Sequence, residues 1–248
     1  MEPDGAGMIE FKRVWKKFGS QVVVRDLSLK VEDGEIFFIL GKTGAGKTVL
    51  IRMLAGLLKP EQGEIWLEDK RVDLMTEDAL KDVRRKCGLI FQSPTLFDSL
   101  KVFENIAFGL RRHFDFSEAE IEARVRNLLE LVHLDPQIAD QYPEFLSFGM
   151  QKRVSLARTI ALEPKYLLYD EPTTGLDPFT ARQINQLIKE LRDKLQVTSI
   201  VVSHDLESMR EVSDRVGLLE DGRFVEIAPT GEFEKSSNPL VRRFLEAV

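Results

Sequence analysis

The sequence has little of several features that would otherwise narrow its class. A single cysteine among 248 residues, Cys87, cannot form an intrachain disulfide, so an oxidising compartment would give this protein no stabilisation. The apolar run at 36–40 is far shorter than the roughly 20 residues that cross a bilayer. Residues 1–8 carry acid instead of a basic stretch and have no apolar run, which argues against a secretory signal.

An excess of basic residues is also missing. The chain has 35 Lys and Arg against 41 Asp and Glu, a formal net charge of −6. A protein that coats nucleic acid is basic overall, so we expect no nucleic-acid partner. What is present is a chain that is 43% hydrophobic and long enough to bury its own core. Composition therefore indicates a soluble globular protein of a reducing compartment.

Hydrophobic periodicity predicts an α/β chain. Short apolar runs followed by helical patterns are typical of a parallel sheet that is covered on both faces. Residues 46–55 are expected to form a helix that Gly56 ends. The expected strands are 9–14, 22–31, 35–40, 64–68, 87–91, 165–169, 199–203 and 216–219.

Between residues 93 and 163 the period becomes helical. Helices are expected at 102–112, 117–132 and 149–162, and Ser117 with Glu120 predicts a capping box. We therefore expect a helical subdomain at about 93–163, inserted in a domain of residues 9–228.

The two ends of the chain are expected to lie outside that domain. Residues 1–8 are small and polar, which predicts disorder. Residues 229–248 form a C-terminal tail with apolar positions at helical spacing, and an exposed apolar stripe needs a partner. We expect 238–248 to dock on a neighbouring subunit. The apolar positions are Val241, Phe244, Leu245 and Val248.

Residues 41–48 form a phosphate-binding loop between an expected strand and helix. Their sequence, GKTGAGKT, fits G-x-x-x-x-G-K-[ST], in which backbone N–H groups and a helix N-terminus surround an anion. Lys47 is expected to reach the β- and γ-phosphates and Thr48 to hold Mg²⁺. The strand–turn–helix context disfavours the alternative, a glycine-rich turn with a surface lysine. The expected nucleotide-binding residues here are Gly41, Lys42, Thr43, Gly44, Ala45, Gly46, Lys47, Thr48 and Val49.

Two acidic residues, Asp170 and Glu171, end another apolar strand. Ligands of open α/β sheets bind beyond the carboxyl ends of the strands, so we expect Asp170 to hold Mg²⁺ and Glu171 to polarise the attacking water. His204, after a further strand, is expected to bind the γ-phosphate or its water. The alternatives are a plain turn before Pro172 and a packed or surface histidine.

Four further segments complete a set of motifs in one order along the chain. Gln92 follows the 87–91 strand, LSFGM occupies 146–150, Gly175-Leu176-Asp177 follows the two carboxylates, and Phe18 precedes Gly19. Together with the phosphate loop, Asp170, Glu171 and His204, they resemble the nucleotide-binding subunits of ABC (ATP-binding cassette) transporters from about residue 9 to residue 227.

The resemblance implies an α/β fold: a P-loop NTPase with a RecA-like core, an antiparallel β subdomain and a helical signature subdomain. It implies an ATPase that uses ATP and Mg²⁺, forms a sandwich dimer with a second copy of itself, and drives an integral membrane permease. The implied catalytic residues are Glu171, His204, Gln92 and Lys47. The implied metal-binding residues are Thr48, Gln92 and Asp170. Phe18, Ser147, Gly149 and Asp177 are the implied nucleotide-binding residues outside the loop.

Phe148 departs from this resemblance, because the family's signature has glycine there. We expect a phenylalanine to crowd the dimer face or to restrict a backbone that only glycine tolerates at positive φ. One open alternative is therefore a regulatory subunit that binds ATP and hydrolyses it weakly. A soluble ABC protein of translation or DNA repair is disfavoured by the single cassette and the acidic charge.

Finer similarity points to a subgroup. Residues 96–108, Met150 with 151–154, and 238–245 look like the Mla/Mce-type phospholipid transport ATPases. That subgroup implies phospholipid transport between envelope membranes, STAS-domain and Mce-domain partners, and a peripheral location on the cytoplasmic face of the inner membrane. The alternative is the ATPase of a small-molecule importer.

Overall fold

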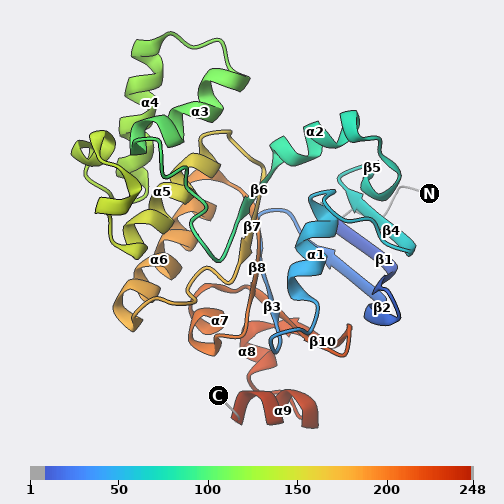
Figure 1. Cartoon of the computed structure of the whole chain (residues 1–248). Coiled ribbons are helices and arrows are strands. Elements are labelled where there is room, and N and C mark those ends of the chain that lie inside the picture. Colours follow the sequence, from blue (N-terminus) through green and yellow to red (C-terminus); the bar gives the residue numbers. More distant parts are fainter. Residues whose placement is uncertain (1–8, 247–248) are drawn as a thin grey trace.

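Two sheets organise residues 9–246, the part of the chain that this computed structural model describes (Figure 1). The first sheet is antiparallel with the strand order β2-β1-β4-β5, and the second has the order β10-β9-β3-β8-β7-β6. In the second sheet β9, β3, β8, β7 and β6 run parallel, while β10 pairs antiparallel with β9. The strands are β1 (Ile9–Phe18), β2 (Gln21–Val31), β3 (Ile36–Leu40), β4 (Gln62–Leu67), β5 (Lys70–Arg71), β6 (Cys87–Ile90), β7 (Tyr166–Asp170), β8 (Thr198–Ser203), β9 (Arg215–Glu220) and β10 (Arg223–Pro229).

Helices cover the parallel sheet on both sides, as Figure 1 shows, with α1 on one side and α5, α6 and α7 on the other. Short 3₁₀ turns (η) join several of them. The helices are α1 (Lys47–Leu54), α2 (Glu77–Lys86), α3 (Val102–His113), α4 (Glu118–Leu131), α5 (Phe148–Ile160), α6 (Pro178–Leu195), α7 (Leu206–Val212), α8 (Thr230–Phe233) and α9 (Pro239–Glu246).

Strand β3 shows why the sheet needs cover on both faces. All five of its residues, IFFIL, are buried. Because strand side chains alternate between faces, Phe37 and Ile39 join the core beneath α1 and the antiparallel sheet, whereas Phe38 and Leu40 join the core formed with α5, α6 and α7. The prediction of a parallel sheet buried on two faces is confirmed.

The helical segment between the Gln92 region and β7 contains α3, α4 and α5, as expected from its period. The capping box at the start of α4 is confirmed: the Ser117 hydroxyl accepts from Glu120 N, and the Glu120 carboxylate accepts from Ser117 N at 2.8 Å. The subdomain and domain bounds given above stay predictions. The expected disorder of residues 1–8 lies outside the described residues.

The C-terminal tail differs from expectation. In α9, Val241 is 0% and Phe244 is 8% exposed, and both belong to the same core as Phe233 of α8. The apolar stripe therefore packs on its own chain and needs no neighbouring subunit to cover it. Val248 lies outside the described residues. The reason for the error is that helical spacing shows one apolar face but not what lies opposite it.

Candidate nucleotide site

The phosphate loop joins the end of β3 to the start of α1, and its backbone takes conformations that suit glycine. Gly44 and Gly46 have φ of +83° and +102°, in the left-handed region. A Cβ on Gly41 would lie 2.6 Å from the Leu219 carbonyl oxygen of β9, so this position has no room for a side chain. The loop thus holds its close turn because of glycine at these places.

Lys47 points back into the loop it follows. Its side chain is buried, and its Nζ donates to Gly41 O at 2.6 Å and to Lys42 O at 3.1 Å. The same Nζ lies 3.3 Å from Glu171 Oε1. The ammonium is therefore held at the loop, where an incoming phosphate would meet it.

Two oxygen ligands of the kind that Mg²⁺ prefers lie side by side next to Lys47. The Thr48 hydroxyl donates to Asp170 Oδ1 at 2.8 Å. Burial raises the pKa of Asp170, and the Thr48 hydrogen bond acts in the opposite direction. Mg²⁺ is often bound by one or two protein oxygens together with substrate phosphates, and this hydroxyl–carboxylate pair fits such an ion.

Glu171 is the most connected carboxylate of the site. It is partly buried, with φ of +52°, and its oxygens lie 2.8 Å from Ser203 Oγ and 3.0 Å from His204 Nδ1. Burial alone would raise its pKa, but hydrogen bonds from His204 and Ser203 and the charge of Lys47 outweigh burial and lower it. Glu171 therefore stays ionised at neutral pH.

One cavity of about 340 Å³ collects most of the predicted residues. Gln92 and His204 reach it from loops that follow two different strands. His204 is exposed in this position, so its ring is accessible to a ligand in the cavity. The cavity is lined by Val23, Thr43, Gly44, Gly46, Lys47, Thr48, Val49, Gln92, Asp170, Glu171, Thr174 and His204.

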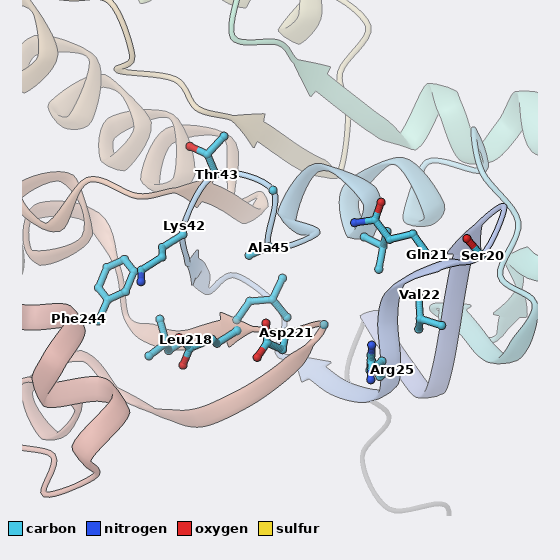
Figure 2. A pocket seen from close by; sticks show the side chains of 15 residues that line it. Ser20, Gln21, Val22, Arg25, Lys42, Thr43, Ala45, Leu218, Asp221 and Phe244 are labelled. Carbon is cyan, nitrogen blue, oxygen red and sulfur yellow. The ribbon is translucent and has the colours of Figure 1, made fainter.

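A second cavity, of about 780 Å³, lies on the other side of the loop. Figure 2 shows the loop residues Lys42, Thr43 and Ala45 on one side of it and Ser20, Gln21 and Arg25 on the other. The ring of Phe244 stands next to Lys42 in this view, so α9 borders the loop.

Three predicted residues of the loop itself, Gly41, Lys42 and Ala45, do not line the cavity over it, and neither do four predicted residues outside the loop. Phe18 ends β1 with its ring 48% exposed and Lys16 Nζ 5.2 Å from its centroid. Ser147 caps α5, and Asp177 caps α6 by accepting from the Phe179 and Thr180 N–H groups. A Cβ on Gly149 would meet Thr180 Cγ2 at 2.7 Å, so the first turns of α5 and α6 are in contact.

The expected strain at Phe148 is absent. Neither Phe148 nor Gly149 has a positive φ, and Phe148 begins α5 with its ring 42% exposed. The prediction that phenylalanine restricts a left-handed backbone is wrong, because a helix start accepts any L residue. The ring is on the surface, so the expectation that it crowds a dimer face stays a prediction.

Two hydroxyls of the site were not predicted. Ser203 Oγ donates to Glu171 Oε2 at 2.8 Å, and Thr174 Oγ1 donates to the same oxygen at 3.1 Å. Ser203 is the last residue of β8, directly before His204, and this position at a strand's carboxyl end was the available signal. The contact of Ser203 with Glu171 requires β7 and β8 to be neighbouring strands, and local sequence does not show which strands pair.

The fold and this cavity define a nucleotide-binding P-loop protein: a glycine loop between strand and helix, a lysine held at it, and a hydroxyl–carboxylate pair beside it. Comparison with known proteins makes the assignment specific. Residues 24–174 match the family described as "ABC transporter", and the chain belongs to this family. ABC transporter ATP-binding proteins are ATPases that bind ATP with Mg²⁺, dimerise and work with membrane permease subunits.

Curated relatives match almost the whole chain. It is 40% identical to "Methionine import ATP-binding protein MetN" of Clostridioides difficile (strain 630), over 96% of this chain and 74% of that protein. It is 41% identical to "Sulfate/thiosulfate import ATP-binding protein CysA" of Bradyrhizobium diazoefficiens, over 96% of this chain and 68% of that protein.

Solved structures agree with the fold. The ATP-binding cassette MJ0796, in a dimeric post-hydrolysis state bound to ADP and Pi, has a TM-score of 0.82 and 31% identity over 90% of this chain and 99% of that one. The cbiO1 structure from Clostridium perfringens, part of the transporter complex cbiONQ, has a TM-score of 0.86 and 28% identity over 97% and 95% of the two chains. The predicted ABC ATPase fold, with its antiparallel and helical parts, is confirmed. In the described residues, no helix is long and apolar enough to cross a membrane.

Proposed function

We propose that this chain hydrolyses ATP at the cavity over residues 41–48 and passes the resulting movement to a membrane permease. The cluster of Lys47, Glu171 and His204 beside the Thr48–Asp170 pair carries the proposal. Lys47 binds the β- and γ-phosphates, and Thr48, Asp170 and Gln92 hold Mg²⁺, which neutralises charge on the phosphate oxygens when bound. The loop N–H groups of 41–49 bind the remaining oxygens.

Glu171 orients the attacking water, and His204 lies where it can bind the γ-phosphate. Glu171 suits this task because it is ionised and is fixed from three sides by Ser203, Thr174 and His204. Phosphates that enter the loop compete with Glu171 for Lys47. The carboxylate is then free to accept a hydrogen bond from water.

The four residues away from the cavity are proposed to act in a dimer. Ser147 is exposed at the N-terminus of α5, and the adjacent N–H groups of that helix suit a phosphate. In a head-to-tail dimer, Ser147 and Gly149 would contact the nucleotide on the second copy, with Asp177 beside them. Phe18, whose ring is exposed, would stack on adenine.

A groove between the core and the helical segment supports a permease partner. This cavity of about 490 Å³ has an apolar lining that includes the exposed side chains of Leu57, Phe97 and Phe108. Arginines stand around it, Arg84, Arg85, Arg112 and Arg158. An apolar floor with a basic rim fits a short cytoplasmic helix of the permease that carries apolar and acidic side chains.

Leu57→Asp tests the groove. We expect it to reduce co-purification of the permease at least tenfold, because a carboxylate would be desolvated in the apolar contact. Leu74→Asp is the matched control, since Leu74 is 70% exposed and lies outside the groove. If both variants lost the permease, or if neither did, the proposal that this groove binds the permease would be wrong. The proposal that the chain hydrolyses ATP would stand, because hydrolysis is measured on the isolated chain.

For the cargo we propose phospholipid. The support is the similarity of 96–108, Met150 and 238–245 to Mla/Mce-type ATPases, which implies STAS-domain and Mce-domain subunits and a peripheral place on the cytoplasmic face of the inner membrane. A specific observation favours a second candidate, small-molecule import: the relatives that match 96% of the chain are named for methionine and sulfate import.

Purification of Glu171→Gln from native membranes, followed by mass spectrometry, separates the two. A multi-span permease with Mce-domain and STAS-domain proteins would support phospholipid. A permease with a soluble solute-binding protein would replace phospholipid by a small molecule and keep the ATPase function.

A further inference from the structure

A buried lysine outside the nucleotide cavity, Lys152, joins two segments with different proposed tasks. It lies on α5, is 6% exposed, and its Nζ donates to Pro172 O at 2.7 Å. Pro172 directly follows Glu171, the proposed water-orienting carboxylate. The lysine therefore holds the turn that carries Glu171, although it does not itself line the cavity.

The other end of this connection is the first turn of α5. The ring centroid of Phe148 lies 5.3 Å from Lys152 Nζ, a cation–π contact between residues four apart on one helix. Ser147 and Gly149, on either side of Phe148, are the residues proposed to meet the second copy's nucleotide. Direct contacts thus run from the N-terminus of α5 through Phe148 and Lys152 to the turn after Glu171.

Burial of the Lys152 ammonium indicates that its positive charge has a function beyond filling space. An apolar side chain would fill the same space without the desolvation that a buried ammonium suffers. Burial lowers the pKa of Lys152 to about 8, and the nearby Glu171 carboxylate acts in the opposite direction. The ammonium therefore remains charged at neutral pH and can both donate to Pro172 O and attract Glu171.

The turn that receives this hydrogen bond needs an anchor. Glu171 has a φ of +52°, which side chains other than glycine adopt only when their surroundings enforce it. Backbone contacts hold one side of the turn, with Glu171 N donating to Val202 O at 2.9 Å. Lys152 holds the other side from α5, so a shift of this helix start would move the carboxylate.

We propose that Lys152 is a positioning residue that couples the two nucleotide sites of the dimer, by linking the start of α5 at the second copy's site to Glu171 at its own. This proposal rests on the proposed roles of Glu171, Ser147 and Gly149. It gives Phe148 a function as well: its ring is the contact between the start of α5 and Lys152.

The test is the dependence of ATP hydrolysis on ATP concentration for the full-length chain, assembled as wild type is. Lys152→Met keeps the volume and removes the donor. We expect kcat to fall at least tenfold and the Hill coefficient to fall towards 1, while the dissociation constant for ATP stays within twofold. Lys152→Arg, which keeps a charged donor, should recover at least half of kcat. Lys189→Met, an exposed lysine on α6, is the control and should match wild type.

A second variant covers the case in which Lys152→Met does not fold. Phe148→Leu keeps an apolar side chain and removes the ring, so kcat and the Hill coefficient should fall together. In the Lys152→Met background the same change should have no further effect, because both act on one path.

Two results would overturn the inference. One is a kcat and Hill coefficient within twofold of wild type for Lys152→Met, or for Phe148→Leu if only that variant folds. The other is weaker ATP binding with unchanged kcat. Glu171→Gln measured in parallel distinguishes failure of the Lys152 inference from failure of the proposed role of Glu171. If Glu171→Gln is inactive while Lys152→Met is normal, only the Lys152 inference fails. If Glu171→Gln hydrolyses at the wild-type rate, the proposed role of Glu171 fails.

Discussion

Two lysines of the same loop have opposite surroundings. Lys47 is buried and bonded to the loop carbonyls, whereas Lys42 is exposed. Lys47→Ala should weaken ATP binding at least tenfold, because a charge-assisted contact in a partly closed site is lost. Lys42→Ala should stay within about threefold of wild type by isothermal titration calorimetry. If both variants lost ATP affinity equally, the total charge of the loop, and not the position of Lys47, would determine that affinity.

At this scale the sequence predicted the groups that belong to motifs and missed the groups that support them. Lys47, Asp170, Glu171 and His204 meet in one place because each ends, follows or begins an element at the same sheet edge. Lys152 was missed for another reason. Its contact with Pro172 joins residues 20 apart, and no local pattern tells that a lysine within a helix will be buried.

At the scale of elements, one carboxylate connects the antiparallel sheet to the parallel one. Glu68, just after β4, accepts from Lys86 Nζ at 2.6 Å and from Lys165 Nζ at 3.0 Å. The hydrogen bond from Lys86 comes first among the causes that lower the pKa of Glu68 to about 2, burial acts against it, and Lys165 adds to it. A depressed pKa means that the stabilisation is present above the unfolded pKa and is lost as pH falls.

Glu68→Gln should therefore lower the free energy of unfolding by about 1 to 2 kcal/mol at pH 6 to 7, after screening by solvent is allowed for. The difference from wild type should shrink as pH falls from about 4.5 towards 2, the range between the ordinary and the lowered pKa. Urea unfolding at several pH values measures it. Glu144→Gln, at an exposed site, is the control. A difference that does not change with pH would mean that the ion pairs contribute nothing.

The packing of α9 should contribute measurably to the free energy of unfolding. Phe244 is 8% exposed in the main core, whereas Leu240 on the same helix is 39% exposed. Phe244→Ala should lower the free energy of unfolding by about 2 to 4 kcal/mol, and Leu240→Ala by less than about 1 kcal/mol. Chemical denaturation of the isolated chain measures both. A negligible loss for Phe244→Ala would contradict the packing of α9 on its own chain and would favour the earlier expectation that this segment docks on another subunit.

Elements with their own local signals were predicted well. The strands of both sheets before β10, except the two-residue β5, and the start of α4 carried such signals. Helix α6 has apolar residues at 184, 187, 188 and 191, which is the spacing of a helix face, but no helix was predicted there. The expectation for α9 was wrong because exposure depends on the rest of the chain.

At the scale of the whole molecule, the two halves of the proposed catalytic machinery lie at different places on one chain. The cavity over residues 41–48 is lined by Glu171 and Lys47, whereas Ser147 and Gly149 do not line it. We therefore expect hydrolysis to need two copies, related so that each supplies the start of its α5 to the other, as proposed above.

The most direct test of this account is the mass and ATP content of Glu171→Gln with Mg-ATP, measured by light scattering and nucleotide analysis. The amide keeps the shape of the side chain but lacks the charge that orients water, so hydrolysis should fall about a hundredfold or more. We expect a species of twice the monomer mass that holds two ATP molecules, and no such species when Lys47→Ala is added. A monomer with bound ATP, or hydrolysis at the wild-type rate, would contradict it.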